Sequence, residues 1–198
     1  MSVILIGIVI LIIGFVAAKA DPILRPYKTM IKTAGVIVIL IGLSIASVVQ
    51  VEPGQVGVQK LFGKVNNNIL ESGLNVINPL VKVVMFDVRT ENYTMSGISD
   101  EGTKQGDDAI RVLSADGLEV IVDLTVLYKV IPSEAPRILK EVGTDYRNVL
   151  VRPICRTKIR DNAVYYDAVA LYSTKRDEFQ SRIFSTIESN FKERGLML

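Results

Sequence analysis

The sequence predicts a membrane-anchored α+β protein: two N-terminal transmembrane helices, then a domain with a β-rich first half and an α/β second half. Three observations support this prediction. Two long apolar runs lie within the first 50 positions. Beyond them, apolar residues alternate in a strand-like pattern as far as Val130, and helical spacing dominates from there to the end of the chain.

The two apolar runs form the predicted anchor, residues 1–50. They extend from Val3 to Ala18 and from Ala34 to Val49, and neither contains a charged residue. Each is about 24 Å of helix against a bilayer core of about 30 Å, and flanking lysines can reach the headgroups. A cleaved signal peptide would need basic residues before the first run, and a soluble core large enough for both runs exceeds what this chain supplies.

A basic linker, residues 19–33, separates the two runs. Its charged residues are Asp21 and four cations: Lys19, Arg25, Lys28 and Lys32. Because short basic loops stay in the cytoplasm, we expect the linker to face the cytosol. The protein is then an integral membrane protein whose domain lies on the non-cytoplasmic side, periplasmic or equivalent. If the two runs instead form a hairpin within one leaflet, the domain is cytosolic.

Composition excludes several functional classes. Histidine is absent and Cys155 is the only cysteine, so the commonest general base and the usual zinc ligands are missing. Residues 51–198 hold 19 basic and 20 acidic side chains, which gives no excess of positive charge for nucleic acid. We therefore expect a protein that is not an enzyme, with no catalytic, cofactor-binding or metal-binding residues, and a packed Cys155.

The first half of the domain, residues 51–109, is predicted to be β-rich and close to the membrane. Strand-like alternation in Gln55–Gly63 and Val81–Met95 flanks a cluster of apolar residues. This cluster either forms sheet core or is a surface that dips into the headgroup region. Its members are Leu74, Val76, Ile77, Pro79, Leu80 and Val81.

The second half, residues 110–198, is predicted to contain a β-hairpin and helices. Asp116-Gly117 between alternating apolar residues indicates the hairpin turn, so Asp116 is a turn residue and not half of a catalytic carboxylate pair. Acidic residues in the loop 96–109 lack the spacing of an EF-hand and are expected to be solvated. Near the C-terminus, four apolar residues recur every four positions and predict a packed helix: Phe179, Ile183, Ile187 and Phe191.

Arg152, Arg156 and Arg160 recur every four residues, so they share one face of a predicted helix. They form a candidate interface for phosphate, lipid headgroups or the acids of a neighbour. Salt bridges within the chain are the alternative, because acids slightly outnumber bases across the domain.

Several segments taken together resemble the prohibitin branch of the stomatin/prohibitin/flotillin superfamily, also called SPFH or band 7. The resemblance covers Val51 to Leu198 and rests on the order and spacing of VEPGQVGVQKLFGKV, ESGLNVINPLVKVVMFDVR, ADGLEVIVDLTVLYKV, EVGTDYRNVLVRPICRTKIRD, YSTKRDEFQSRI and ERGLML. It implies an SPFH domain of two α/β parts, of which the first rests on or in the membrane.

The resemblance also implies a function and partners. We expect a non-enzymatic scaffold that assembles, with itself or a paralogue, into a large ring or cage and organises a membrane microdomain. Membrane lipids are the expected partners, and a membrane-bound AAA protease, which some prohibitin-like members enclose or restrain, is a further candidate. The alternative function is a direct protein-binding regulator or chaperone of membrane proteins.

Two departures from the family pattern are visible. The family usually enters with one hydrophobic segment, whereas this chain has two. The coiled coil that normally follows the domain is absent from the 198 residues, and the apolar Leu196-Met197-Leu198 after a helix stop suggests that another strand begins and that the natural protein continues.

Overall fold

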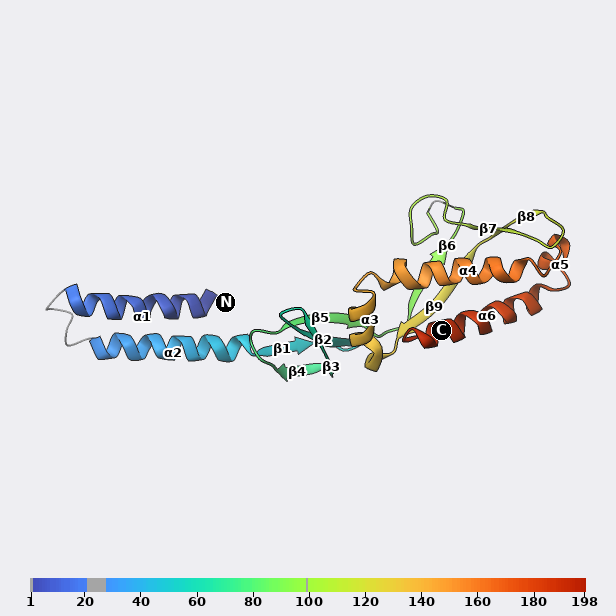
Figure 1. The fold of residues 1–198 in the computed structure, drawn as a ribbon. Coiled ribbons are helices and arrows are strands. Elements are labelled where there is room, and N and C mark those ends of the chain that lie inside the picture. The colour runs from blue at the N-terminus through green and yellow to red at the C-terminus, as the bar shows by residue number, and fades with distance from the viewer. Residues whose placement is uncertain (1, 21–27, 99) are drawn as a thin grey trace.

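Two helices precede a domain of short strands and helices in the computed structural model, which describes residues 2–20, 28–98 and 100–198 (Figure 1). The helices are α1 (Ser2–Ala20) and α2 (Lys28–Ala46). They lie side by side and run in opposite directions (Figure 1). Glycines allow this close approach: a Cβ on Gly7 would lie 2.6 Å from Cγ1 of Ile39, and one on Gly35 would lie 3.0 Å from Cγ of Leu11.

The second helix differs from the predicted apolar run Ala34–Val49 at both ends, and the expected helix end at Val49 is wrong. Helix α2 ends at Ala46, because Val48 and Val49 pair in a strand, for which β-branched residues are well suited. It begins at Lys28, so Lys28 and Lys32 belong to a helix and not to the linker turn. The backbone of Lys19 lies in α1, whereas Arg25 lies outside the described residues.

The first half of the domain contains a two-stranded ribbon and a three-stranded sheet. In the ribbon, β1 (Val48–Val51) pairs antiparallel with β4 (Gly73–Val76). In the sheet, β2 (Gln55–Leu61) lies between β3 (Lys64–Leu70) and β5 (Lys82–Asp87), again antiparallel. A small core of Val51, Leu70 and Ile77 joins the ribbon to the sheet.

The second half contains a hairpin and another three-stranded sheet. The hairpin is β7 (Ile110–Leu113) with β8 (Glu119–Val122), which confirms the predicted hairpin. Its loop is longer than a two-residue Asp-Gly turn: Leu113 pairs with Glu119, and only Gly117 has a positive φ, +79°, whereas Asp116 does not. In the sheet, β9 (Leu124–Val130) lies between β10 (Leu196–Met197) and β6 (Glu91–Met95).

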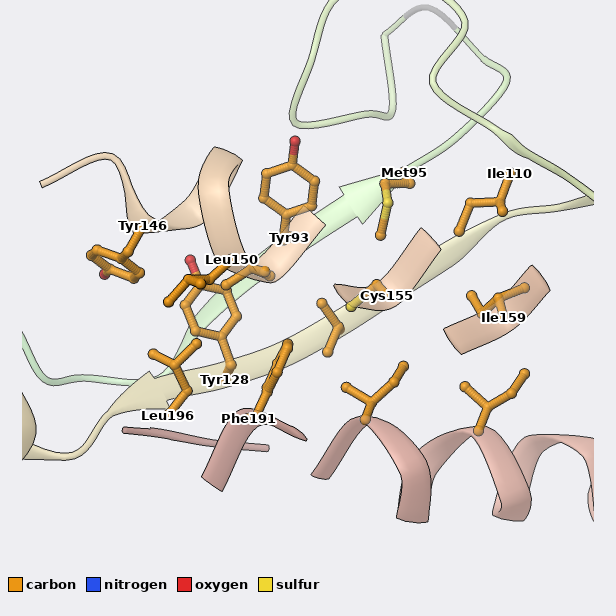
Figure 2. Close-up of a cluster of buried hydrophobic side chains, with 14 of the residues drawn as sticks. Tyr93, Met95, Ile110, Tyr128, Tyr146, Leu150, Cys155, Ile159, Phe191 and Leu196 are labelled. Carbon is orange, nitrogen blue, oxygen red and sulfur yellow. The ribbon is translucent and has the colours of Figure 1, made fainter. Parts of the chain in front are cut away.

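Helices cover this second sheet and complete the core. After a 3-10 turn (Pro132–Glu134), the chain forms α3 (Ala135–Glu141), a π-helical turn (Arg147–Val151), α4 (Arg152–Ala163), α5 (Ala168–Tyr172) and α6 (Arg176–Glu193). All four apolar residues predicted to pack from the last helix are buried on α6. In Figure 2, side chains from β6, β9, α4 and α6 meet around Tyr128 and Cys155.

The observed α+β architecture confirms the coarse fold prediction. The expected division after Ala109 does not separate the strands cleanly, because β6 pairs with β9 along Glu91↔Tyr128 to Met95↔Leu124. One hydrophobic core therefore includes Val56 and Phe86 from the first half as well as residues of the second half. The two halves form one packed body.

A candidate membrane-contact surface beside the second helix

One residue, Ser47, separates the apolar helix α2 from strand β1. Its N–H donates to the carbonyl of Leu43 (3.0 Å), as in a continuing helix, and its hydroxyl donates to the same carbonyl (2.8 Å). Its own carbonyl accepts the N–H of Ile77 (2.7 Å). The end of α2 thus continues into β1 and is hydrogen-bonded to Ile77, the residue after β4, and the ribbon β1–β4 continues the line of the helix in Figure 1.

The six residues predicted to form sheet core or membrane surface divide between these roles. Ile77 is buried against Val51 and Leu70, and Pro79 and Val81 are half-buried. Three others are exposed, by 76% for Leu74, 83% for Val76 and 58% for Leu80. Val76 lies opposite Val48, which is itself exposed, so apolar side chains surround the end of α2.

Helix α2 has the length and composition of a membrane span. Its residues Thr29–Ala46 form an 18-residue window with mean hydropathy 2.1, and α1 contributes a shorter apolar stretch, Leu5–Val16. Beyond the faces that pack together, large apolar side chains are exposed on both helices, among them Ile13, Phe15 and Leu40. An apolar exterior of this size is typical of a surface that contacts lipid or protein.

The second half of the domain holds the predicted arginine face, and two of its arginines are engaged within the chain. Arg152 (2.5 Å) and Arg156 (2.9 Å) both pair with the carboxylate of Asp108, which is only 4% exposed. The expectation that the acidic residues of this loop are solvated is therefore wrong at Asp108, because the two guanidinium groups replace water around its carboxylate. Arg156 also donates to the carbonyl of Ala109 (3.2 Å). The alternative of internal salt bridges therefore holds for these two, and they fasten the loop 96–109 to α4.

Arg160 is the exposed member of this face. Its nearest partner among the described hydrogen bonds is the carbonyl of Arg111, at 3.4 Å. The role of the three arginines as an interface stays a prediction, and Arg160 is the residue that can serve it without loss of an internal ion pair.

An apolar groove of about 800 Å³ lies between α6 and the strands β8 and β9. Its rim carries exposed apolar side chains from both sides, including Ile121, Leu127 and Phe184. Sequence reasoning did not find this groove, because its two walls are about 60 residues apart in the chain and each reads as an ordinary amphipathic element.

Asp116 and the two acidic residues that follow it, Glu119 and Asp123, could be read as paired carboxylates for acid–base chemistry, but all three have structural partners. Asp116 accepts the hydroxyl of Ser114 and the N–H of Ala168, and Asp123 accepts the N–H of Gly97. Glu119 lies 3.9 Å from Arg111. In the described parts of the chain, no group of three or more Asp, Glu, Cys or His residues is placed to hold a metal ion.

Cys155 is fully buried in the core between α4 and the sheet (Figure 2). Burial raises the pKa of its thiol to about 12, so the thiolate is scarce at neutral pH. The expectation of a packed cysteine is confirmed.

A partly buried polar network around Glu91 had no local signal in the sequence. The Glu91 carboxylate on β6 accepts hydrogen bonds from the hydroxyls of Tyr128 (3.1 Å) and Tyr146 (3.2 Å) and pairs with Arg147. Burial first, and then the charge of Glu91, raise the pKa of Tyr146 to about 12 and raise that of Tyr128 as well. The network joins β6 and β9 to the π-helical turn that precedes α4.

These features define an α+β domain that is joined directly to an apolar N-terminal helix and exposes apolar side chains around the junction. A family model described as SPFH domain / Band 7 family matches residues 49–198, and the chain belongs to this family. No curated protein matches the chain. The SPFH expectation is thereby confirmed, whereas the prohibitin branch stays a prediction. SPFH proteins are generally non-enzymatic, often associate with membranes and generally act as membrane scaffolds.

Proposed function

We propose that this protein is an oligomeric membrane scaffold: α1 and α2 insert as an antiparallel hairpin, and the SPFH domain stands on the bilayer surface beside them. The observation that carries the proposal is the junction at Ser47, where an apolar helix passes directly into the domain. Val76 lies opposite Val48 beside this junction, and Val76, Leu74 and Leu80 would all be exposed to water without a membrane. Burial of apolar surface in lipid would hold the domain against the membrane.

In this proposal the two helices span the membrane, the linker lies in the cytosol, and the domain lies on the opposite side. The basic residues at this end of the hairpin favour this orientation: Arg25 between the helices, and Lys19, Lys28 and Lys32 in the adjoining helix turns. Cysteines placed one at a time in the linker 21–27 and at Asp100 would be labelled with an impermeant maleimide from each side of intact membranes. The native Cys155 does not interfere, because it is buried. Labelling of both positions from the cytosolic side would exclude the two-span topology.

Many copies are proposed to stand side by side in a ring or cage formed by this chain alone or with a paralogue. Family membership supports this part of the proposal, as does the exposed groove between α6 and β9, which offers apolar surface of the kind that subunit contacts bury. A closed wall would act by confinement. It would segregate lipids, or hold a membrane-bound AAA protease away from its substrates, without chemistry of its own.

The assembly is tested by the mass of the full-length chain after extraction in a mild detergent. The expected result is a large, discrete oligomer, and a monomer at cellular concentration would contradict the proposal. Phe184→Glu and Arg160→Glu then distinguish the contact surfaces, since Phe184 lies on the groove and Arg160 on the arginine face. Loss of the oligomer in only one variant identifies the face that pairs with a neighbour.

A further inference from the structure

The β2–β3 hairpin ends in an exposed aromatic side chain. Leu61 pairs with Lys64, so Phe62 and Gly63 form the turn. Phe62 is 87% exposed, more than any other large apolar residue in the described parts of the chain. It also has φ +46°, a left-handed conformation that an aromatic residue adopts at a cost and that Asn or Gly would adopt more easily. The turn thus exposes a phenyl ring at a position whose backbone conformation favours Asn or Gly.

Three lysines surround this tip. Lys60 lies directly opposite Lys82 in the pairing of β2 with β5, and Lys64 begins β3 on the other side of the turn. Like charges opposite each other destabilise a strand pair unless an anion lies between them. Within residues 28–98, no Asp or Glu forms an ion pair with any of the three. The tip therefore combines an unshielded positive charge with an exposed ring.

The hairpin tip lies at the end of the sheet that faces α2. Strand β1 leads away from α2 for four residues, about 13 Å, and β2 returns for seven, about 23 Å. Strand β5 begins at Lys82, directly after the loop 77–81. In this loop the N–H of Val81 donates to the carbonyl of Asn78, and the N–H of Ile77 donates to the carbonyl of Ser47 at the end of α2. The start of β5 and the tip beside it are thus on the side of the sheet nearest the end of α2 (Figure 1).

We propose that the β2–β3 tip is a binding site for anionic lipid headgroups, with Lys60, Lys64 and Lys82 around the phosphate groups and the ring of Phe62 inserted among the upper acyl chains. This inference rests on the proposed function, because it requires the bilayer into which α2 inserts. The chemistry fits: aromatic rings favour the membrane interface, and basic side chains at the surface of an anionic membrane are attracted to it. The ligand is the headgroup of a lipid such as phosphatidylglycerol.

The absence of tryptophan from the sequence makes the site directly measurable. Full-length Phe62→Trp protein is reconstituted in vesicles of phosphatidylcholine, with and without phosphatidylglycerol, that contain lipids brominated on the upper acyl chain. The matched control is Leu118→Trp, an exposed apolar residue beside the turn of the β7–β8 hairpin, which lies far from α2 in Figure 1. We expect bromolipid to quench the Phe62→Trp emission and to leave the Leu118→Trp emission unchanged. Equal emission from both variants, without quenching, would overturn the proposal.

The lysines are tested in the same Phe62→Trp background. Phosphatidylglycerol should increase the quenching, and each single Lys→Gln change at position 60, 64 or 82 should lower the apparent affinity for this lipid about fivefold. Quenching that does not respond to phosphatidylglycerol or to the lysines would refute the headgroup site. Inorganic phosphate added to phosphatidylcholine vesicles should have no effect, and a response equal to that of phosphatidylglycerol would show a free-phosphate site instead.

Oligomer mass, measured on the same samples, separates this inference from the scaffold proposal. Discrete oligomers with an unquenched Phe62→Trp would refute the lipid site and leave the scaffold intact. Monomers with lipid-dependent quenching would refute the scaffold and support the lipid site.

Discussion

The ion pairs of Asp108 give the most direct test of how the domain is held together. Asp108→Asn removes the charge that faces Arg152 and Arg156 and leaves two guanidinium groups opposite a neutral amide. Loss of one partner of a buried pair costs about 3–5 kcal/mol, and the partial exposure of both arginine side chains, 27% and 20%, places the expected cost near the lower figure, about 3 kcal/mol. For a domain of this size that corresponds to a fall in Tm of about 6–12 °C.

The measurement is thermal unfolding of the full chain in detergent, followed by far-UV circular dichroism. Asp107→Asn is the matched control, because Asp107 is the preceding residue and pairs with Arg111 (2.6 Å), but both of those side chains are about half exposed. Exposed pairs contribute little, so we expect only a small change in Tm. If Asp107→Asn lowered Tm as much as Asp108→Asn, burial would not be the reason for the effect and the argument would fail.

The pH dependence gives an independent check on the same carboxylate. The hydrogen bond from Arg152 and the charges of Arg152 and Arg156 lower the pKa of Asp108 in the folded protein. A carboxyl group with a lowered folded pKa stabilises the fold at pH values above its unfolded pKa of about 4, and this stabilisation is lost as pH falls through the folded pKa. The difference in Tm between wild type and Asp108→Asn should therefore be constant from neutral pH to about pH 5 and shrink below about pH 4.

Three further predictions concern other parts of the molecule. Cys155, whose thiol pKa burial raises to about 12, should not react with a thiol reagent at pH 8 in the folded protein and should react fully in denaturant; rapid reaction under native conditions would contradict its burial. Gly35→Leu should separate α1 from α2 and speed amide hydrogen exchange in both helices, because even a Cβ at position 35 would lie against Leu11. The control Val36→Leu, on the exposed face of α2, should leave the exchange rates unchanged. Equal exchange rates in the two variants would refute the packing of the two helices. In an absorbance titration, Tyr146 and Tyr128 should ionise above the ordinary tyrosine pKa, near pH 12 for Tyr146. Because their pKa values are raised in the folded protein, folding stability should fall as pH rises from about 10 through 12. Simultaneous ionisation of all tyrosines in the folded protein would show that the network around Glu91 does not form.

Elements with a regular local pattern could be predicted from the sequence. The spacing of Phe179, Ile183, Ile187 and Phe191 is enough to identify the buried face of α6, because residues four apart on a helix lie on the same face. Likewise, Asp116-Gly117 between alternating apolar residues identifies its hairpin, since glycine readily adopts the positive φ that the turn needs at Gly117. These signals lie within a few residues of one another and need no knowledge of the rest of the fold.

The end of α2 could not be predicted in the same way. Val48 and Val49 are as apolar as the helix before them, and only their partner β4, about 25 residues later, makes them a strand. That pairing also decides which residues of the apolar cluster are exposed: Ile77 turns into the core, whereas Leu74 and Val76 remain outside. Pairing partners distant in sequence leave no local trace.

The candidate sites show the same limit. Asp107 and Asp108 are adjacent identical residues, yet one is half exposed and the other is buried between two arginines. The arginine spacing correctly indicated a shared helix face, but it could not show that Asp108 forms ion pairs with two of the three arginines. Phe62 carries no local signal, because its exposure depends on the hairpin tip being free of neighbours.

The direct passage from α2 through Ser47 into β1 has a mechanical consequence. Both the N–H and the carbonyl of Ser47 are held by hydrogen bonds, so these bonds resist rotation of the domain about the end of α2. A helix that tilts to match a thinner bilayer would carry the domain with it as a rigid lever. In the proposed ring, membrane thickness and curvature would then set the angle between neighbouring domains, and with it the diameter of the ring.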